Sequence, residues 1–164
     1  MIKMISHAEL LRLVDYDRET GIITRKVRTS NRVHVGDIVG FPDANGYLQA
    51  NIGGVRAYVH QFVWLYVHGV WPDHDIDHRN RDTQNNTISN LRRATASENL
   101  ANKKRPSNNT SGFKGVHPKR SKWCSQIRCG GQRITLGVFE TPELAHAAYC
   151  DAAKRLFGEF ARAA

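Results

Sequence analysis

Asp, His and Asn side chains that could together hydrolyse a phosphodiester lie within 23 residues of one another in the middle of the chain. Asp77 and His78 are adjacent, Asn90 follows His78 by 12 positions, and Asn99 follows Asn90 by 9. Histidine can deprotonate water near neutral pH. Carboxylate and amide oxygens bind hard divalent cations, which stabilise the charge on a leaving oxygen. A hydrolytic site is therefore one interpretation, and an ordinary Asn-rich turn is the other.

Three elements must bring these residues together: a strand, a loop and a helix. We expect a short strand at 75–77 that ends at His78, and a helix that begins near Ala94 and carries Asn99. The residues between Arg79 and Ser89 are expected to form a connecting polar loop. An Asn side chain can bond nearby backbone and hold such a loop, so Asn90 is expected to be structural.

A family resemblance rests on this spacing and on several short stretches around it. Residues 58–102 resemble the HNH endonucleases, which have a ββα-metal fold. The third position of the motif is Asn here, an H-N-N variant, and the pattern is most similar to the phage- and intron-associated homing endonucleases. The matching stretches are His60-Gln61-Phe62-Val63-Trp64, Ile76-Asp77-His78, Asn85-Asn86, Asn90-Leu91-Arg92 and Glu98-Asn99.

The resemblance implies a role for each motif residue. His78 would be the general base, oriented by Asn90, and Asp77 and Asn99 would hold the divalent metal. An Asn in place of a ligating His shifts the expected ion toward Mg²⁺ or Mn²⁺. His60 is expected to pack in or support the site, or else to contact phosphate.

Positive charge is concentrated in the second half of the chain. The net charge is +9, and the stretch between Asn99 and Phe139 has nine Lys or Arg and no Asp or Glu. A one-sided field of this kind attracts a polyanion, with nucleic acid favoured over a membrane surface. A purely solubilising surface is the alternative, but natural surfaces usually mix the two signs.

The last 50 or so residues divide into three strand candidates and one helix. The strands are GFKGV, WCSQIRC and QRITLGVF, separated by turn residues. The helix follows, with Thr141 as its cap, Pro142 at its first position and Gly158 at its end.

Residues 111–164 resemble the AP-two/ethylene-response-factor DNA-binding domain, in which a three-stranded sheet lies in the major groove. The matching points are Gly115-Val116, Trp123, Ile127-Arg128, Leu136-Gly137, Phe139, Thr141-Pro142-Glu143, Ala147-Ala148-Tyr149-Cys150-Asp151 and Gly158. A sheet of two or three strands fits that groove. We expect Arg128 and Arg133 to pair with guanine edges or phosphate, and Trp123 either to stack on DNA or to lie in the core. The remaining expected DNA contacts are Arg92, Lys114, Lys119, Arg120 and Lys122.

The sequence therefore predicts an α+β protein with four regions. These are an N-terminal β-rich region (1–57), an HNH ββα-metal nuclease core (58–103), a Pro/Ser/Asn-rich linker (104–110) and a DNA-binding domain of a three-stranded antiparallel sheet on one helix (111–164). In the first region we expect a helix at 5–14 and strands at 22–26, 37–41, 47–52 and 56–60. A helix at 58–67 should follow.

The cysteine content and the hydropathy of the chain indicate the cellular compartment of the protein. There are three Cys and no CxxC pair, which argues against a disulfide framework and a zinc ribbon. No signal peptide or membrane span is apparent, so we expect a cytosolic protein, in the host cytosol if it is phage-encoded.

The predicted function is a metal-dependent DNA endonuclease that acts on double-stranded DNA as a monomer or weak dimer. A single site should nick one strand, and no membrane or small-molecule cofactor is expected. One alternative is a DNA-binding regulator with an inactive HNH domain. An RNA-binding protein is another, but a sheet cannot read the narrow A-form major groove.

Overall fold

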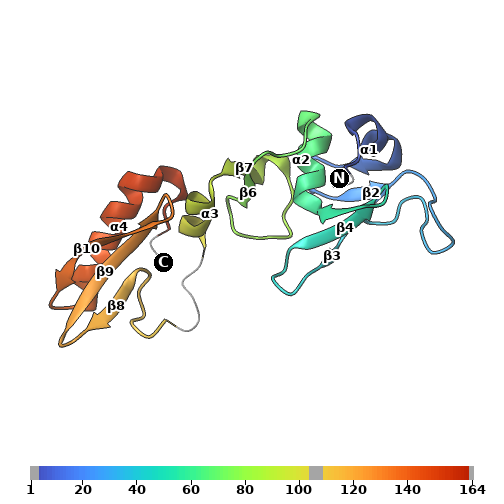
Figure 1. Ribbon diagram of the computed structural model, residues 1–164. Coiled ribbons are helices and arrows are strands. Elements are labelled where there is room, and N and C mark those ends of the chain that lie inside the picture. Colours follow the sequence, from blue (N-terminus) through green and yellow to red (C-terminus); the bar gives the residue numbers. More distant parts are fainter. Residues whose placement is uncertain (1–3, 104–108, 163–164) are drawn as a thin grey trace. The chain divides into compact units, whose positions relative to one another are not determined.

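The computed structural model describes residues 4–103 and 109–162 (Figure 1). In these ranges the protein is α+β, with four α-helices and several small antiparallel sheets. Close contacts divide the chain into two units, Met1–Arg93 and Ala94–Ala164, which are described separately below. Among the described residues, no helix has the length and apolar character needed to cross a membrane.

The first unit begins with a helix and a small hairpin. Helix α1 (His7–Leu13) is capped by Ser6, whose side chain accepts a hydrogen bond from the Glu9 amide. Strand β1 (Val14–Tyr16) then pairs antiparallel with β2 (Ile23–Arg25), with Tyr16 opposite Ile23. The helix and the second strand confirm the prediction, whereas β1 was not predicted.

A second antiparallel sheet and a long helix complete the core of the first unit. The sheet has the order β3 (Phe41–Pro42), β4 (Leu48–Ile52) and β5 (Val55–Tyr58). Helix α2 (Val59–His68) follows β5 directly and ends at Gly69, as its apolar spacing predicted. The predicted strand at 37–41 is reduced to one bridge between Thr24 and Ile38 before β3 begins. The fully buried side chains include Leu10, Val14, Ile23, Ile52, Phe62 and Leu65.

The Asp-His pair lies on a two-stranded sheet that closes a loop. Strand β6 (Asp75–His78) pairs with β7 (Leu91–Ala94), and the 3₁₀ turn η1 (Ile88–Asn90) precedes β7. The Arg79 amide donates to the Asn90 carbonyl across 2.8 Å, which closes the loop at its base. The strand ending at His78 confirms the prediction. Strand β7 was not predicted, because Arg92 and Arg93 stand between its two apolar residues, Leu91 and Ala94, and leave no alternating pattern.

The second unit begins with a short helix and continues into a sheet. Helix α3 (Ala96–Asn102) starts with a capping box in which Thr95 and Glu98 each bond the other's backbone amide. The sheet has the order β10-β9-β8, formed by β8 (Val116–Lys119), β9 (Lys122–Cys129) and β10 (Gln132–Phe139).

Helix α4 packs on this sheet and forms the core of the second unit. It spans Pro142–Phe157, is capped by Thr141, and is followed by η2 (Gly158–Phe160). Its core contains Ile127 from β9 and Ala101 from α3, together with Tyr149, Ala152, Ala153 and Phe157 of α4. The sequence predicted the helix near Ala94, the second and third strands and the last helix. The first strand was expected at 112–116 (GFKGV), but β8 begins only at the last of these residues, Val116. The contact boundary between the units lies before α3, whereas the expected linker at 104–110 follows it and lies mostly outside the described residues.

The loop between β6 and β7 rests against the β1–β2 turn at Gly21. This glycine has φ +75°, and a Cβ placed on it would meet the Thr87 backbone nitrogen and lie 2.6 Å from the Asn86 carbonyl carbon. Gly36 also has a positive φ, +88°, but a Cβ there would meet no atom within 4 Å. The two glycines therefore share a left-handed backbone and differ in the space beside it.

We predict that Gly21→Ala destabilises the first unit more than Gly36→Ala does. Both changes strain a left-handed residue, at a cost of about 1–2 kcal/mol, but only Gly21→Ala also pushes on backbone. The extra loss should be at least about 1 kcal/mol. Urea unfolding followed by the fluorescence of Trp64 and Trp71 measures the difference. Equal losses for the two variants would show that the loop does not rest on this turn.

Candidate active site

His78 is a buried histidine at the end of β6. Its relative exposure is 3%, and its ring lies among other aromatic rings. The His60 ring is nearly perpendicular to it at a centroid distance of 5.2 Å, and the Tyr47 ring lies at 5.9 Å. A polar ring so deeply buried needs hydrogen-bond partners.

One partner of His78 is the side chain of Asn86. The His78 Nε2 atom lies 3.2 Å from Asn86 Oδ1, and Asn86 is itself only 1% exposed. Its Nδ2 donates to the Gln84 carbonyl at 3.1 Å, and its own carbonyl accepts from the Tyr16 hydroxyl at 3.0 Å. In the sequence, Asn86 is only one of the residues that match the family, and no role was predicted for it. Nothing in the composition separates it from the neighbouring Asn85.

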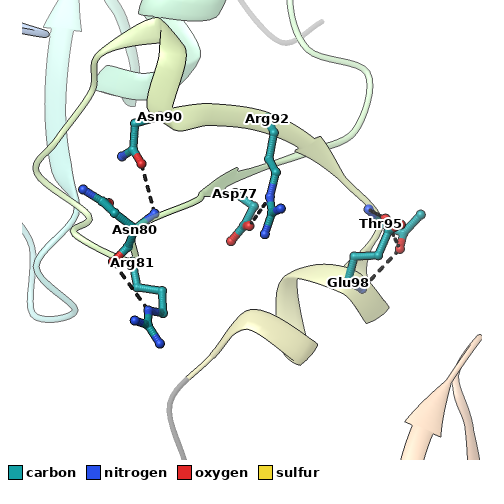
Figure 2. Close-up of polar contacts among 7 residues, drawn as sticks. All are labelled: Asp77, Asn80, Arg81, Asn90, Arg92, Thr95 and Glu98. Atoms are coloured by element: carbon teal, nitrogen blue, oxygen red, sulfur yellow. Dashed lines mark hydrogen bonds and ion pairs between the residues drawn. The ribbon is translucent and has the colours of Figure 1, made fainter. Parts of the chain in front are cut away.

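Asn90 bonds the backbone at both ends of the loop. Its Oδ1 accepts from the Asn80 amide at 3.0 Å, as Figure 2 shows, and its Nδ2 donates to the Asn85 carbonyl at 2.8 Å. Asn80 lies two residues after His78, and Asn85 directly precedes Asn86. The Asn90 side chain therefore fixes the path of the chain between His78 and its partner.

Asp77 forms a buried ion pair with Arg92 across the two strands. Arg92 Nε lies 2.8 Å from Asp77 Oδ2, and the two side chains are only 6% and 5% exposed (Figure 2). Arg92 was expected to contact DNA from the surface. Instead it lies inside the first unit, on β7, where it neutralises the carboxylate expected to bind metal.

Burial favours the neutral form of both histidines. It lowers the pKa of His78, partly opposed by the hydrogen bond to Asn86 and by the charges of Asp77 and Asp82. Burial and the proximity of His78 lower the pKa of His60 to about 3. At neutral pH the His78 ring is therefore favoured in the form that can accept a proton.

His60 packs within the first unit, which was one of the alternatives expected of it. It is 7% exposed and stacks on the Tyr58 ring at 5.3 Å with an interplanar angle of 12°. The Tyr58 hydroxyl donates to Asp43 Oδ2 at 3.3 Å, and Tyr47 lies against both rings. These rings form an aromatic wall beside His78.

Asn99 lies on α3, among the residues of the second unit. It is half-buried, and its amide donates to the Thr95 carbonyl at 2.9 Å. Among the residues that the structure describes, no group of three or more His, Cys, Asp or Glu side chains is placed to hold a metal ion. The expected ligands Asp77 and Asn99 offer oxygen atoms only, the donor type that suits Mg²⁺ or Mn²⁺.

Arg128 and Arg133 face each other across β9 and β10, and both are exposed. Two like charges directly opposite on one sheet face repel each other unless an anion lies between them. The next pair on that face, Gln126 and Thr135, is joined by a hydrogen bond of 3.2 Å. Asn109, His117, Gln126, Arg128 and Arg133 line a shallow depression on the second unit. This face therefore carries charge and hydrogen-bonding groups suited to a polyanion.

The other expected DNA contacts of the second unit differ in how exposed their side chains are and in whether they already bond another group. Lys119 and Arg120 are exposed at the turn between β8 and β9, while Lys122 pairs with Glu140 at the surface. Trp123 is half-buried on β9. Lys114 is the exception, because its Nζ donates to the Lys103 carbonyl at 2.8 Å and to the Ala101 carbonyl at 2.5 Å. It thus satisfies the C-terminal end of α3.

Comparison with known proteins places an endonuclease motif over the same segment. Residues 57–101 match the family model described as HNH endonuclease. The chain is also 32% identical over 106 residues to Protein 3.8 of Escherichia phage T7, a match that covers 63% of this chain and 87% of that protein. No solved structure matches the chain.

We predict that Arg92→Ala unfolds the first unit more readily than Arg93→Ala does. Removing Arg92 takes away a buried charge partner of the Asp77 carboxylate, which costs about 3 kcal/mol or more. Arg93 is the matched control, because it is 64% exposed and pairs with the exposed Asp73. Urea denaturation of the two variants measures the difference. A loss for Arg92→Ala no larger than that for Arg93→Ala would contradict the buried pair.

Proposed function

The chain belongs to the family of Protein 3.8 from Escherichia phage T7 and contains an HNH endonuclease domain, and on this basis we propose that it is a metal-dependent DNA endonuclease. The observation that carries the proposal is the buried His78 beside Asp77, held on a strand end within the matched segment. The proposed domain limits are those expected from the sequence, with the nuclease core at 58–103 and a DNA-binding domain at 111–164.

His78 is proposed as the general base. It would take a proton from water as the water oxygen bonds to phosphorus and the bond from phosphorus to the 3′ oxygen breaks. The lowered pKa of His78 keeps the ring neutral and ready to accept that proton. Asn90 is proposed to assist indirectly, because its two hydrogen bonds hold the loop that follows His78.

Asp77 and Asn99 are proposed to hold the divalent ion, Mg²⁺ or Mn²⁺. The ion would stabilise the negative charge on the leaving 3′ oxygen. The hydrogen bond from Arg92 Nε to Oδ2 orients the Asp77 carboxylate. Mg²⁺ commonly uses one or two carboxylates with water and phosphate oxygens, which agrees with a small protein donor set.

The second unit is proposed to bind duplex DNA through β8, β9 and β10, as the likeness to the AP-two/ethylene-response-factor domain implies. The opposed pair Arg128–Arg133 supports this assignment, because a phosphate or a guanine edge would relieve the repulsion between the two guanidinium groups. Lys119, Arg120 and Lys122 are proposed to contact phosphate, and Trp123 to stack on DNA. Arg92 and Lys114 leave this set, since each has a structural partner.

Joining the two activities in one chain raises the local concentration of the cutting site on bound DNA. A monomer with a single site would nick one strand, so cleavage of both strands would need a weak dimer or two encounters. The proposed setting is the cytosol, that of the host cell if the protein is phage-encoded. If the HNH domain is inactive, the same DNA-binding face would make the protein a DNA-binding regulator.

We predict that the protein nicks supercoiled plasmid in the presence of Mg²⁺ or Mn²⁺. His78→Ala should lower the nicking rate by about 10²- to 10⁴-fold, the usual contribution of a general base. His34→Ala is the matched control, since His34 is 64% exposed and distant in sequence from the motif. Wild-type protein that binds DNA but does not nick it with either metal would favour the regulator. Nicking that survives His78→Ala would mean that another group is the base.

We predict that replacing both Arg128 and Arg133 by Ala weakens binding to duplex DNA and reduces its salt dependence. Two lost phosphate contacts should lower the slope of log K against log salt by about 2. Fluorescence anisotropy with a labelled duplex at several salt concentrations measures both effects. Arg12→Ala is the control, because it also removes an exposed arginine but lies on α1, where Arg12 pairs with Glu9. Unchanged affinity in the double variant would remove this sheet from the proposed interface.

A further inference from the structure

We infer that Asn86 is the positioning residue of the catalytic base: it fixes which ring nitrogen of His78 carries the proton and which accepts one. The inference rests on the proposed role of His78. It assigns a role to a residue that the sequence left without one, and it links the N-terminal region to the chemistry.

The Gln84 carbonyl determines the direction of both hydrogen bonds that the Asn86 side chain makes. The Gln84 carbonyl can only accept, so the atom of Asn86 that faces it at 3.1 Å must be the amide nitrogen. The amide oxygen Oδ1 therefore faces His78 Nε2 at 3.2 Å. An amide oxygen can only accept, so Nε2 must carry a proton and donate it.

This direction determines the chemistry of the ring. A neutral imidazole has one protonated nitrogen and one that accepts. With the proton held on Nε2, the nitrogen that takes a proton from water is Nδ1. The Asn86 oxygen also keeps its bond as the ring becomes positively charged, and a hydrogen bond from a charged donor is stronger than one from a neutral donor.

Asn86 is itself held from three sides within the first unit. Its side-chain nitrogen bonds Gln84, its carbonyl accepts from the buried Tyr16 hydroxyl at 3.0 Å, and its backbone lies against Gly21. A further bond of 3.0 Å, from the Thr83 hydroxyl to the Gly46 carbonyl, joins the same loop to the β3–β4 turn. The β-rich N-terminal region thus supports the base from outside the HNH motif.

A buried Asn could also serve packing alone, and two substitutions separate the two roles. Asn86→Asp keeps an acceptor for Nε2–H but loses the donor to Gln84. Asn86→Ala loses both. A packing residue would make both variants similarly defective, whereas a positioning residue would leave Asn86→Asp with an ordered ring. Asn85→Ala is the matched control, because the Asn85 side chain bonds Thr87 and not His78.

The test is ¹H–¹⁵N NMR of the histidine rings in the full-length, metal-free protein at neutral pH. The His78 signals are identified by their loss in His78→Gln. We expect wild type, Asn85→Ala and Asn86→Asp to show a slowly exchanging proton on Nε2. In Asn86→Ala and, to a smaller extent, Tyr16→Phe, that proton should exchange faster. A wild-type proton on Nδ1 in place of Nε2, or an unchanged Nε2 proton in Asn86→Ala, would overturn the inference.

Kinetics give the second readout and separate this inference from the proposed function. In single-turnover nicking, Asn86→Ala should lower the rate of the chemical step by about 10- to 100-fold, an effect typical of a residue that orients a functional histidine, while DNA affinity stays the same. Asn86→Asp should recover part of that loss, and an unchanged rate in Asn86→Ala would overturn the inference. Wild-type protein with the Nε2 proton but without nicking would overturn the proposed function and leave the hydrogen bond standing.

Discussion

The burial of two polar side chains, Asp77 and His78, is the constraint on which the first unit depends. A carboxylate and an imidazole removed from water lose several kcal/mol of solvation unless each gains a close partner. Arg92 supplies that partner for Asp77, and Asn86 supplies one for His78. Arg92 lies on β7 and Asn86 lies in the loop before it, so pairing β7 with β6 brings Arg92 to Asp77 and closes the loop that carries Asn86. Burial favours the neutral form of His78, and the hydrogen bond to Asn86 fixes the orientation of its ring.

The loop between β6 and β7 therefore holds a partner of His78 in place as well as connecting the two strands. Its polar side chains are largely directed to its own backbone: Asn90 bonds Asn80 and Asn85, and Asn86 bonds Gln84. The loop in turn lies against the β1–β2 turn at Gly21 and is bonded to the β3–β4 turn at Gly46. The β-rich N-terminal region thereby supports this loop. Its small sheets are the rigid support that a loop-borne partner requires.

Local patterns in the sequence predicted most of the elements, while the partners within the site could not be predicted. The helix expected at 58–67, the cap at Thr141 and the strand ending at His78 depend on neighbouring residues. Each was found within a residue of its expected place. By contrast, the pairing of Asp77 with Arg92 depends on how two strands meet 15 residues apart. Arg92 and Lys114 were expected to contact DNA because both are basic. Charge alone cannot distinguish an arginine that pairs inside a sheet, or a lysine that bonds helix carbonyls, from one that meets phosphate.

We propose that this chain hydrolyses a DNA phosphodiester by attack of water, with the 3′ oxygen as the leaving group. The most direct measurement is to treat metal-dependent nicked plasmid with a DNA ligase that seals only a 3′ hydroxyl next to a 5′ phosphate. The proposed mechanism predicts that the nicks formed by the wild-type protein are resealed. Nicks that cannot be resealed, and that carry a 3′ phosphate or a damaged sugar, would contradict it.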